Sequence, residues 1–493
     1  IYNPKKTAGD VNLDEAVDIC DLVYLESVTK SNEIKTTTVD VGRIGTFENA
    51  PATLRSILIG TYIDINKPGI SVDKSAYTPS TVTLTLYDED SYGITWQTAK
   101  APYTPVVQVT EGEAFDPANY LEYEASFSKA ESYDKTGSSY NYYVSKAVIT
   151  GLEAGKVYTY RCYDKYADAA SKSYTFTARN DTNESSFKFV HVGDSQTNAA
   201  DSSSPDGTGT GIHYANTMKG VELNGFDRDF IVHSGDIVEW SKYESYWTSM
   251  IGDNDKYFAE IPVMTVSGNH ETSYRSGANE VYKHFNYNIH SQNVSAGFSY
   301  SFDYGNTKFI MLDTNGLTNN QLPDDEYIWL SETLEKNTQK WTIVVMHNPM
   351  YSVGVYGSNP DRNAIALALR EQLGDLFAEN GVDLVIQGHD HEYSKTYPIG
   401  VDGAINNQPT YETINGINYC TNANGVIYSM HGPAGNQTRT PYSTIETEFY
   451  ETYSGSHTSS WAEVEVTDEL LTVKVYYYNS GTPTLWTAYG IKK

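Results

Sequence analysis

Cysteine is scarce in this chain, which has only three among its 493 residues, Cys20, Cys162 and Cys420. They lie far apart, without the close spacing of cysteine metal ligands, and their odd number provides no disulfide framework. Free cysteine is among the residue types that are most often buried. We therefore expect these three side chains to be small, buried apolar groups.

Long apolar runs and positive charge are also scarce. No stretch reaches the ~18 apolar residues that a membrane-spanning helix requires. The chain has 34 lysines and arginines against 63 aspartates and glutamates, a net charge of −29. Because nucleic acids and anionic membranes repel such a chain, we do not expect them as partners. The excess of acidic groups suits a protein that holds cations.

Length and composition favour several domains and a place outside the cell. The length predicts about three domains. Tyrosine is abundant, with 42 residues, whereas charged residues make up only 20% of the chain. Such a composition is typical of extracellular proteins. A sequence that begins at Ile1 and not at methionine favours a signal peptide that has been removed. We therefore expect a secreted or cell-surface protein.

A calcium-binding pattern lies within the first unit, residues 1–72. Oxygen ligands at positions 1, 3, 5, 7, 9 and 12 of a tight loop converge on one large cation. An acidic loop that binds no cation is the alternative. In residues 10–21 these positions are Asp10, Asn12, Asp14, the carbonyl of Ala16, Asp18 and Asp21.

The same stretch, GDVNLDEAVDICDLVYL at residues 9–25, resembles a dockerin repeat. The resemblance implies a small α-helical module that binds Ca²⁺ and a cohesin-type protein partner. Glu15 departs from the pattern, because this position of the loop usually holds glycine. A second copy at residues 40–60 has Gly42 and Ile44 at ligand positions. Packing within the chain is therefore the alternative to docking.

Residues 73–182 have the alternation that is typical of β-strands. TVTLTLY at 81–87 and GITWQT at 93–98 alternate apolar and polar residues with a period of two. Turn signals separate such stretches, which predicts an all-β sandwich. GLEAGKVYTYRC at 151–162 resembles the strand pair of fibronectin type III domains. We expect this domain to be a spacer or a wall of the substrate cleft.

The third unit, residues 183–493, contains five apolar runs that each end in potential metal ligands. Such runs predict buried strands. Open α/β sheets bind ligands at the carboxyl ends of neighbouring strands, so we expect one site at that edge. Carboxylate, amide and imidazole groups suit hard or borderline metal ions. The runs are FKFVHVGDSQ at 187–196, FIVHSGD at 230–236, VMTVSGNHE at 263–271, WTIVVMH at 341–347 and VDLVIQGHDH at 382–391.

Helical patterns lie between these strands. At 326–335 and 363–379, apolar residues recur at intervals of three and four. The order of strand, helix and strand predicts α/β layers. The stretches at 461–466 and 471–478 alternate again, and we expect them to add strands to a second sheet.

The motifs GDSQ, GDIVEW, GNHE, VVMHNPMY and GHDHEY, in this order, resemble the signature of the calcineurin-like metallophosphoesterases. With the fibronectin-like domain in front, they are most similar to the purple acid phosphatase-type branch. The resemblance implies a multidomain chain whose last unit is a four-layer α/β fold, a β-sandwich flanked by helices. It also implies two metal ions (Fe, Mn or Zn) and a small phosphorylated substrate. Two such ions neutralise phosphate oxygens and produce hydroxide from water near neutral pH.

The resemblance assigns roles to the motif residues. Asp236 would bridge the two ions, and metal-bound hydroxide would attack phosphorus. His270 would lie over the phosphate and stabilise the transition state or protonate the leaving group. Glu271 and Asp390 are expected to orient imidazoles. The first ion would take Asp194, Asp236 and His391, and the second would take Asp236, Asn269, His347 and His389.

Two positions depart from the family pattern. Gln196 stands where many metallophosphoesterases have histidine, and an amide oxygen ligates more weakly than imidazole. Glu239 stands where the purple branch has a tyrosinate, three residues after Asp236, so no purple charge-transfer band is expected. Gln196 remains a candidate ligand. Glu239 is either a further carboxylate ligand, or a residue that does not bind the metal and is exposed or contacts the ligands.

The remaining histidines and two tyrosines have simpler interpretations. His191 and His233 lie inside strands and are expected to be hydrogen-bonded core residues. We expect surface positions for three others, and packing or cleft positions for Tyr351 and Tyr393. The three surface histidines are His284, His290 and His457, while His213 and His431 are candidates for reaching the substrate.

We therefore expect a secreted, metal-dependent phosphoesterase. A phosphomonoesterase is the first hypothesis, following the branch resemblance. A phosphodiesterase or nucleotide hydrolase is the second, because the motif residues do not define the second ester group. A third, of another class, is a surface or scaffold-bound binding protein whose site has lost activity through Gln196 and Glu239. Metal-dependent turnover of a phosphate ester separates the third hypothesis from the first two.

Overall fold

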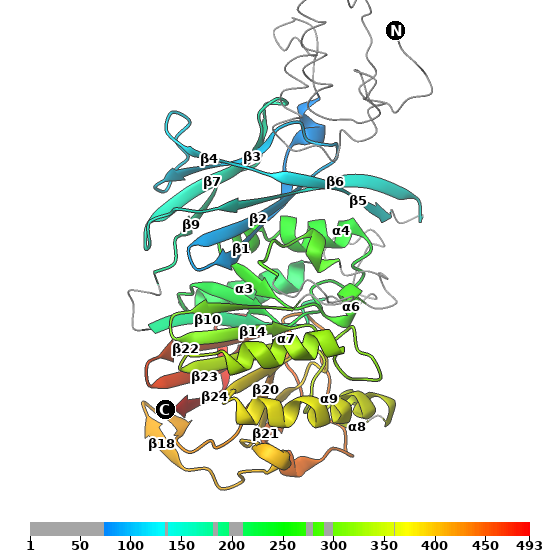
Figure 1. Ribbon diagram of the computed structural model, residues 1–493, viewed down its shortest axis with the longest axis vertical. Coiled ribbons are helices and arrows are strands. Elements are labelled where there is room, and N and C mark those ends of the chain that lie inside the picture. The colour runs from blue at the N-terminus through cyan, green and yellow to red at the C-terminus, as the bar shows by residue number, and fades with distance from the viewer. Residues whose placement is uncertain are drawn as a thin grey trace, which may run out of the picture.

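The computed structural model describes residues 73–133, 137–180, 186–196, 211–272, 280–289, 299–358 and 360–493. Figure 1 shows a β domain, in blue and cyan, stacked on a larger α/β unit. The predicted calcium loop at 10–21 lies outside the described residues, as do the dockerin-like module, Cys20 and His290. Within the described ranges, none of the helices has the length and apolar character needed to cross a membrane.

The β domain consists of two antiparallel sheets, as the alternating pattern predicts. One sheet has the strand order β1-β2-β6-β5 and the other β4-β3-β7-β8, with β9 beside β7. Cys162 is free and buried in this domain, as expected, and so is Cys420 in the α/β unit. The likeness to fibronectin type III domains remains a prediction. The elements are η3 (Lys74–Tyr77), β1 (Ser80–Asp88), β2 (Ser91–Thr98), β3 (Pro105–Glu111), β4 (Leu121–Glu124), β5 (Ser126–Tyr133), β6 (Ser139–Ile149), β7 (Val157–Asp164), β8 (Ala169–Ala170) and β9 (Tyr174–Thr177).

The polar positions of strand β1 join the two units. Thr83 and Thr85 are buried, although alternation predicts an exposed face for them. The Thr83 hydroxyl donates to the His284 carbonyl at 2.5 Å, and the Thr85 hydroxyl donates to the Asn286 carbonyl at 2.6 Å. Lys146 of β6 donates to the carbonyl of Phe285 at 2.8 Å. The β domain therefore braces the segment that follows the GNHE motif.

The α/β unit contains two mixed sheets. One has the order β12-β11-β10-β22-β23-β24-β19-β18, and the other β13-β14-β15-β16-β20-β17-β21. Strands β10, β11 and β12 are parallel to one another, as are β14, β15, β16 and β20. The strands are β10 (Ser186–Val192), β11 (Phe230–His233), β12 (Val263–Thr265), β13 (Tyr300–Tyr304), β14 (Thr307–Leu312), β15 (Trp341–Met346), β16 (Leu384–Gln387), β17 (Tyr393–Thr396), β18 (Tyr411–Ile414), β19 (Ile417–Cys420), β20 (Ile427–His431), β21 (Tyr450–Ser454), β22 (Ser460–Thr467), β23 (Leu470–Tyr477) and β24 (Thr484–Lys492).

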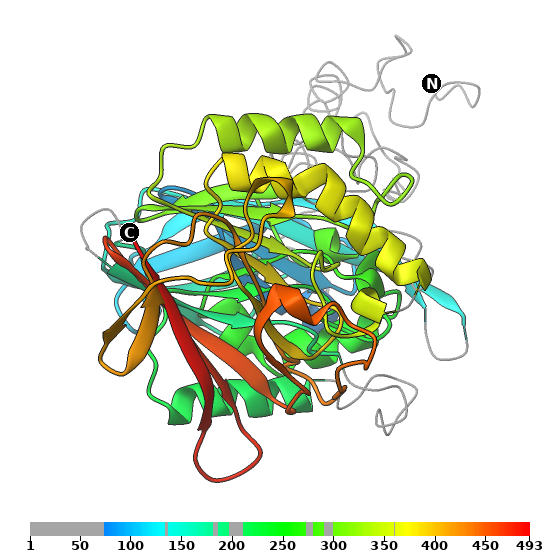
Figure 2. The same ribbon diagram turned by 90° about the horizontal axis from the view of Figure 1, so that it is seen from below.

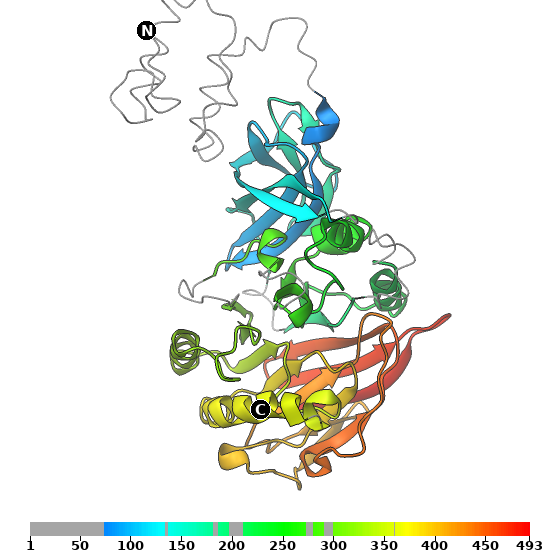
Figure 3. The ribbon, with the colours of Figure 1, turned by 90° about the vertical axis from the view of Figure 1, so that its right-hand side faces the viewer.

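Helices cover the outer faces of the two sheets. Figures 2 and 3 show α7 and α9 side by side outside the seven-stranded sheet, and Figure 2 shows α3 on the opposite side. Strand β15 explains the layering, because Ile343 and Val345 enter the core between the sheets while Val344 and Met346 pack with the helices. The helices are α3 (Ile212–Leu223), α4 (Glu244–Trp247), η4 (Thr248–Gly252), α5 (Asp255–Ala259), α6 (Asn269–Thr272), η5 (Val281–Lys283), α7 (Asp324–Glu335), α8 (Val355–Ser358), α9 (Pro360–Glu379), η6 (Val401–Gly403) and η7 (Thr447–Phe449).

The placement of the motif strands corrects two expectations. The five strands do not share one sheet: β10, β11 and β12 belong to the eight-stranded sheet, whereas β15 and β16 belong to the seven-stranded sheet. The C-terminal strands β22 and β23 extend the sheet of β10, because β22 pairs with β10 in antiparallel register. The motif ends still converge, since both sheets present carboxyl ends of parallel strands at the same edge of the sandwich.

A buried histidine pair links the two sheets behind this edge. His191 of β10 and His431 of β20 approach each other with their Nδ1 atoms 2.9 Å apart, and Tyr489 lies 3.3 Å from Nε2 of His431. Burial lowers the pKa of His431 to about 3. Burial and the neighbouring His431 lower the pKa of His191 as well. Both imidazoles are therefore neutral in the folded protein.

Replacement of His431 by glutamine is expected to weaken the acid sensitivity of folding. The unfolded chain takes up a proton on this histidine below pH ~6.5 and the folded chain does not, so stability is lost as the pH falls from ~6.5 toward 3. The variant should reduce the pH dependence of the unfolding free energy by ~1.4 kcal/mol per pH unit. Urea unfolding at several pH values, with chelator in both samples, measures this. Identical slopes for the two proteins would contradict the assignment.

Candidate metal centre

Four motif residues adopt an unusual backbone conformation immediately after their strands. Asp194, Asp236, His389 and His391 have positive φ angles of 51°, 54°, 78° and 65°. Residues other than glycine seldom occupy this region, and they do so mainly where the surrounding structure compensates the strain. The turns direct the four side chains to one place at the edge of the sandwich.

The glycine of the GNHE motif is required by close packing at this edge. A Cβ atom on Gly268 would lie 2.1 Å from Oδ1 of Asp236 and 2.2 Å from its backbone nitrogen. Any larger residue would displace Asp236. The glycine therefore allows the third motif loop to contact the second.

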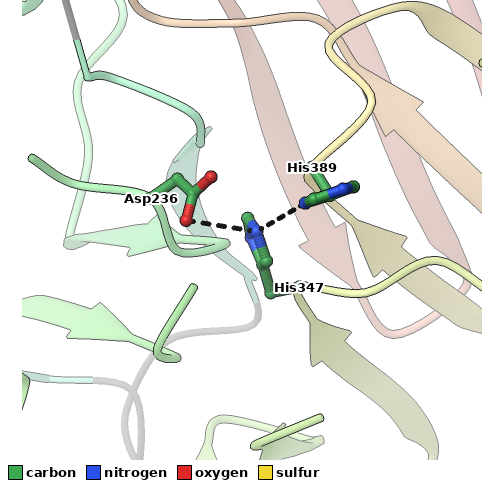
Figure 4. Close-up of side chains that lie close together, drawn as sticks. All are labelled: Asp236, His347 and His389. Carbon is green, nitrogen blue, oxygen red and sulfur yellow. Dashed lines mark hydrogen bonds and ion pairs between the residues drawn. The ribbon is translucent and has the colours of Figure 1, made fainter. Parts of the chain in front are cut away.

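The side chains form two groups that could each hold a metal ion, and both groups contain Asp236. The first consists of Asp194, Asp236 and His391, and the second of Asp236, His347 and His389. Oδ1 of Asp236 lies 3.3 Å from Nε2 of His347, and Oδ1 of Asp194 lies 3.5 Å from Nε2 of His391. Figure 4 shows Asp236, His347 and His389 pointing toward one another. One carboxylate is thus shared between two adjacent groups.

Two amide side chains complete these groups. Oδ1 of Asn269 lies 2.7 Å from Nδ1 of His389 and 3.1 Å from Nε2 of His347, within the second group. Nε2 of Gln196 lies 3.2 Å from Oδ2 of Asp236, within the first group. The other amide atom, Oε1, is buried and has no hydrogen-bond partner among the described residues. If the Gln196 amide is rotated by half a turn, Oε1 takes the position of Nε2 beside Asp236. The side-chain oxygen and nitrogen atoms around this position therefore fit a cation.

Backbone carbonyls orient two of the imidazoles. Nδ1 of His347 donates to the Ser234 carbonyl at 2.8 Å, and Nδ1 of His391 donates to the Gln437 carbonyl at 2.7 Å. Each ring therefore presents Nε2 to the centre. Such hydrogen bonds determine the tautomer of metal-binding histidines and their orientation. The Gln437 carbonyl was not foreseen, since nothing in the local sequence places it beside His391.

The electrostatics of the centre also suit a cation. Burial opposes the ionisation of Asp236, but the His270 and His347 imidazoles outweigh it and hold the Asp236 pKa well below its usual value. Burial raises the pKa of Asp194 to about 8, with Asp236 adding to this rise. Burial lowers the pKa of His391 to about 3. Burial opposes the charging of His347, but the Asp236 carboxylate outweighs it and raises the His347 pKa to about 10. A metal ion would displace this proton, because histidine binds metals as the neutral imidazole.

His270 lies beside the shared carboxylate. Its Nδ1 donates to the Glu239 carbonyl at 2.9 Å, which directs Nε2 toward Oδ2 of Asp236 at 3.6 Å. Its backbone N–H donates to Oδ1 of Asp236 at 2.9 Å. The Glu239 carboxylate accepts a hydrogen bond from Nε2 of Gln437 at 3.1 Å and belongs to neither group. The geometry favours Glu239 as a residue outside the ligand set.

Glu271 and Asp390 have functions other than the expected orientation of imidazoles. The Glu271 carboxylate accepts hydrogen bonds from the backbone N–H groups of Asp236 and Ile237, both at 2.9 Å. It therefore holds the turn that carries the shared carboxylate. Asp390 accepts a hydrogen bond from the Ser352 hydroxyl and one from the Tyr356 N–H at 2.8 Å, so it orders the loop after His347.

Several other expectations are corrected by the structure. His284 is buried rather than exposed, with its ring stacked on Trp247 at a centroid distance of 3.9 Å. His431 does not reach the centre, because it pairs with His191 in the core. The core interpretation is confirmed for His191, and for His233, whose Nε2 lies 2.9 Å from the Ser195 hydroxyl.

Of the two positions expected for Tyr351 and Tyr393, packing or cleft, the structure shows packing. Tyr351 packs on Tyr428 and Phe449, and Tyr393 on Trp486, so both are packing residues. Tyr356, which the sequence did not single out, places its ring 4.6 Å from that of His389. His213 and His457 are half-buried, and neither belongs to the two groups.

Comparison with known proteins decides the family. Residues 187–393 match the family model of the calcineurin-like phosphoesterases, and residues 79–178 match that of the purple acid phosphatase N-terminal domain. The chain contains a calcineurin-like metallophosphoesterase unit. Its front domain is of the purple acid phosphatase type. The match to this family implies divalent metal ions.

Relatives of this metallophosphoesterase include active and inactive proteins by name. It is 24% identical over 432 residues to "Purple acid phosphatase 15" of Arabidopsis thaliana, covering 80% of this chain and 75% of that protein. It is 24% identical over 310 residues to "Probable inactive purple acid phosphatase 1" of the same plant, covering 59% of this chain but only 49% of the relative. The chain therefore spans about half the length of that relative and three quarters of the other.

A solved structure has the same fold. The purple acid phosphatase from yellow lupin (Lupinus luteus) seeds superimposes with a TM-score of 0.67 at 20% identity, covering 84% of this chain and 74% of that chain. Because the superposition covers 84% of this chain, it includes both the front domain and the metallophosphoesterase unit. The recognition made from the motif order is thus confirmed.

Proposed function

We propose that this chain is a phosphomonoesterase that uses two metal ions. The observation that carries the proposal is the shared Asp236, which belongs to both potential metal groups. A carboxylate common to two groups holds two cations at the short separation that two-metal hydrolysis requires. When bound, the ions offset the charge of the phosphate and supply an activated water as nucleophile.

The proposed ligands follow from the two groups. Gln196 lies beside the first group and Asn269 within the second, and their amide oxygens add a neutral donor to each. Neither group contains a thiolate, and Glu239 replaces the tyrosinate of the purple branch. We therefore propose Fe, Mn or Zn in the divalent state and no purple colour. The proposed ligands are Asp194, Asp236, His391 and Gln196 in the first site and Asp236, Asn269, His347 and His389 in the second.

His270 is the proposed proton donor. Because Nδ1 donates to the Glu239 carbonyl, Nε2 is the atom that faces the centre. In the cationic form of the ring, Nε2 carries the second proton, 3.6 Å from Oδ2 of Asp236, and this proton can pass to the leaving oxygen as the P–O bond breaks. His270 itself is buried.

The first experiment is to measure turnover of 4-nitrophenyl phosphate and bis(4-nitrophenyl) phosphate. The protein is stripped with chelator and resupplied with manganese, iron or zinc. Metal-dependent release of nitrophenol is expected, at a higher rate for the monoester. The ratio of the two rates separates a phosphomonoesterase from a phosphodiesterase.

Failure in this experiment has a specific meaning. Absence of turnover with every metal, in a protein shown to contain two bound ions, would replace the proposal by the inactive binding protein. Turnover that persists after complete metal removal would also contradict it. Secretion of the protein remains part of the proposal and is tested by fractionation of the source cells.

A further inference from the structure

The segment after β20 reaches from the metal centre to its exposed rim. The backbone N–H of Gly435 donates to the Asp194 carbonyl at 3.1 Å, and the Gln437 carbonyl accepts the hydrogen bond from His391 at 2.7 Å. Two residues further on, Arg439 is exposed. Its backbone is held in place, because its N–H donates to the Ser456 hydroxyl at 2.7 Å. The segment therefore fixes the start of the Arg439 side chain close to the ligands.

The guanidinium of Arg439 is available for a ligand. It makes no hydrogen bond or ion pair with any residue in the described part of the chain. No carboxylate in that part of the chain therefore neutralises its charge by a direct ion pair.

A second arginine lies near the other metal group. Tyr356 of α8 places its ring 4.6 Å from the ring of His389. Arg362, in the first turn of α9, is exposed, and its Cζ lies 5.8 Å from the centroid of Tyr356. Two guanidinium groups therefore border the centre in a chain whose net charge is −29. Such local positive charge in an acidic protein attracts anions specifically to this rim.

We infer that Arg439, assisted by Arg362, forms an anion subsite that selects phosphate monoesters with a second negatively charged group near the scissile phosphate. A guanidinium presents a planar fork of N–H donors that matches a carboxylate or a phosphate in a bidentate manner. The subsite lies outside the groups that would hold the metals, so it binds the non-reacting part of the substrate. This inference rests on the proposed function and specifies its substrate class.

The test compares two substrates that differ by one charge, phenyl phosphate and 4-carboxyphenyl phosphate. The full-length, metal-loaded protein is expected to have a higher kcat/KM for the carboxylated ester. Arg439→Gln should lower the ratio of the two kcat/KM values about tenfold, since a hydrogen-bonded ion pair with the substrate is lost. Arg439→Lys retains the charge without the fork and should lower the ratio less.

A charge-matched control and a salt series complete this test. Lys129 is exposed on strand β5 of the front domain and lies on neither of the segments that carry Arg439 and Arg362. Lys129→Gln therefore removes one positive charge elsewhere and should leave the ratio unchanged. Raising the salt concentration should reduce the ratio in the unmodified protein more than in Arg439→Gln. An unchanged ratio in Arg439→Gln, or an equal loss for both esters, would overturn the inference.

A binding measurement separates this inference from the proposed function. Calorimetry on the metal-loaded protein is expected to show tighter binding of pyrophosphate than of orthophosphate, and Arg439→Gln should reduce that preference about tenfold. If neither ester is hydrolysed but the preference and its loss are observed, the catalytic proposal fails and the anion subsite stands. If hydrolysis occurs and pyrophosphate has no advantage, the subsite fails alone.

Discussion

Asp236→Asn is expected to lower kcat/KM for 4-nitrophenyl phosphate by at least about 10³-fold, because two metal sites lose their common ligand. The substitution preserves the size of the side chain and an oxygen that can accept the hydrogen bond from the His270 N–H. It removes the negative charge that both groups share. Metal content, measured by mass spectrometry, should fall together with the rate.

Asp227→Asn provides the matched control for this prediction. Asp227 is exposed in the loop before β11, so the control removes an identical charge from a position outside the centre. It should retain both metal and activity. An Asp236→Asn variant that kept its full metal content and its rate would show that the carboxylate bridges nothing.

His270→Ala is expected to reduce kcat by about 10²- to 10³-fold while metal content stays the same. Nε2 of His270 lies near Asp236, but the imidazole belongs to neither potential metal group. Its loss should therefore remove the proton donor rather than the ions. His457→Gln is a control, because His457 stacks on Tyr477 and belongs to neither ligand group.

The choice of leaving group makes this second prediction specific. Nitrophenolate is a stable anion and departs with little help, whereas an alkoxide needs a proton as the P–O bond breaks. The loss caused by His270→Ala should thus be larger for an alkyl phosphate, such as glycerol 2-phosphate, than for 4-nitrophenyl phosphate. Equal losses for both esters would assign His270 to stabilisation of the phosphoryl oxygens instead of proton transfer.

The candidate site could be largely predicted, because its signals are local. Each motif couples an apolar run, which predicts a buried strand, to a ligand-type side chain directly after it. Asp194, Asp236, His347, His389 and His391 were found in this way, and the structure brings all five together. The order of the five motifs also indicated the family, because that order can be read from the sequence without a structure.

Other features of the site could not be predicted, because they depend on contacts between distant segments. The carbonyl of Gln437 orients His391, Glu271 holds the turn of Asp236, and Tyr356 packs on His389. Gln437 and Tyr356 carry no local pattern that differs from ordinary surface or loop sequence. Glu271 belongs to the GNHE motif, but the motif does not reveal that its carboxylate holds the turn of Asp236. The position of Arg439 at the rim has the same origin, since its backbone N–H donates to the hydroxyl of Ser456, which follows β21.

By itself, the sequence determined the family, the positions of the motif strands and the chemical type of the metal ligands. These follow from hydrophobic periodicity and side-chain chemistry, which are properties of the local sequence. Only the tertiary structure decided how the strands divide between two sheets. An alternating pattern predicts which face of a strand is buried but not what covers that face. Only the fold shows that Thr83 and Thr85 contact the second unit and that His191 contacts His431. The centre exists because the carboxyl ends of β10, β11 and β12 in one sheet meet those of β15 and β16 in the other, although these strands are far apart in sequence.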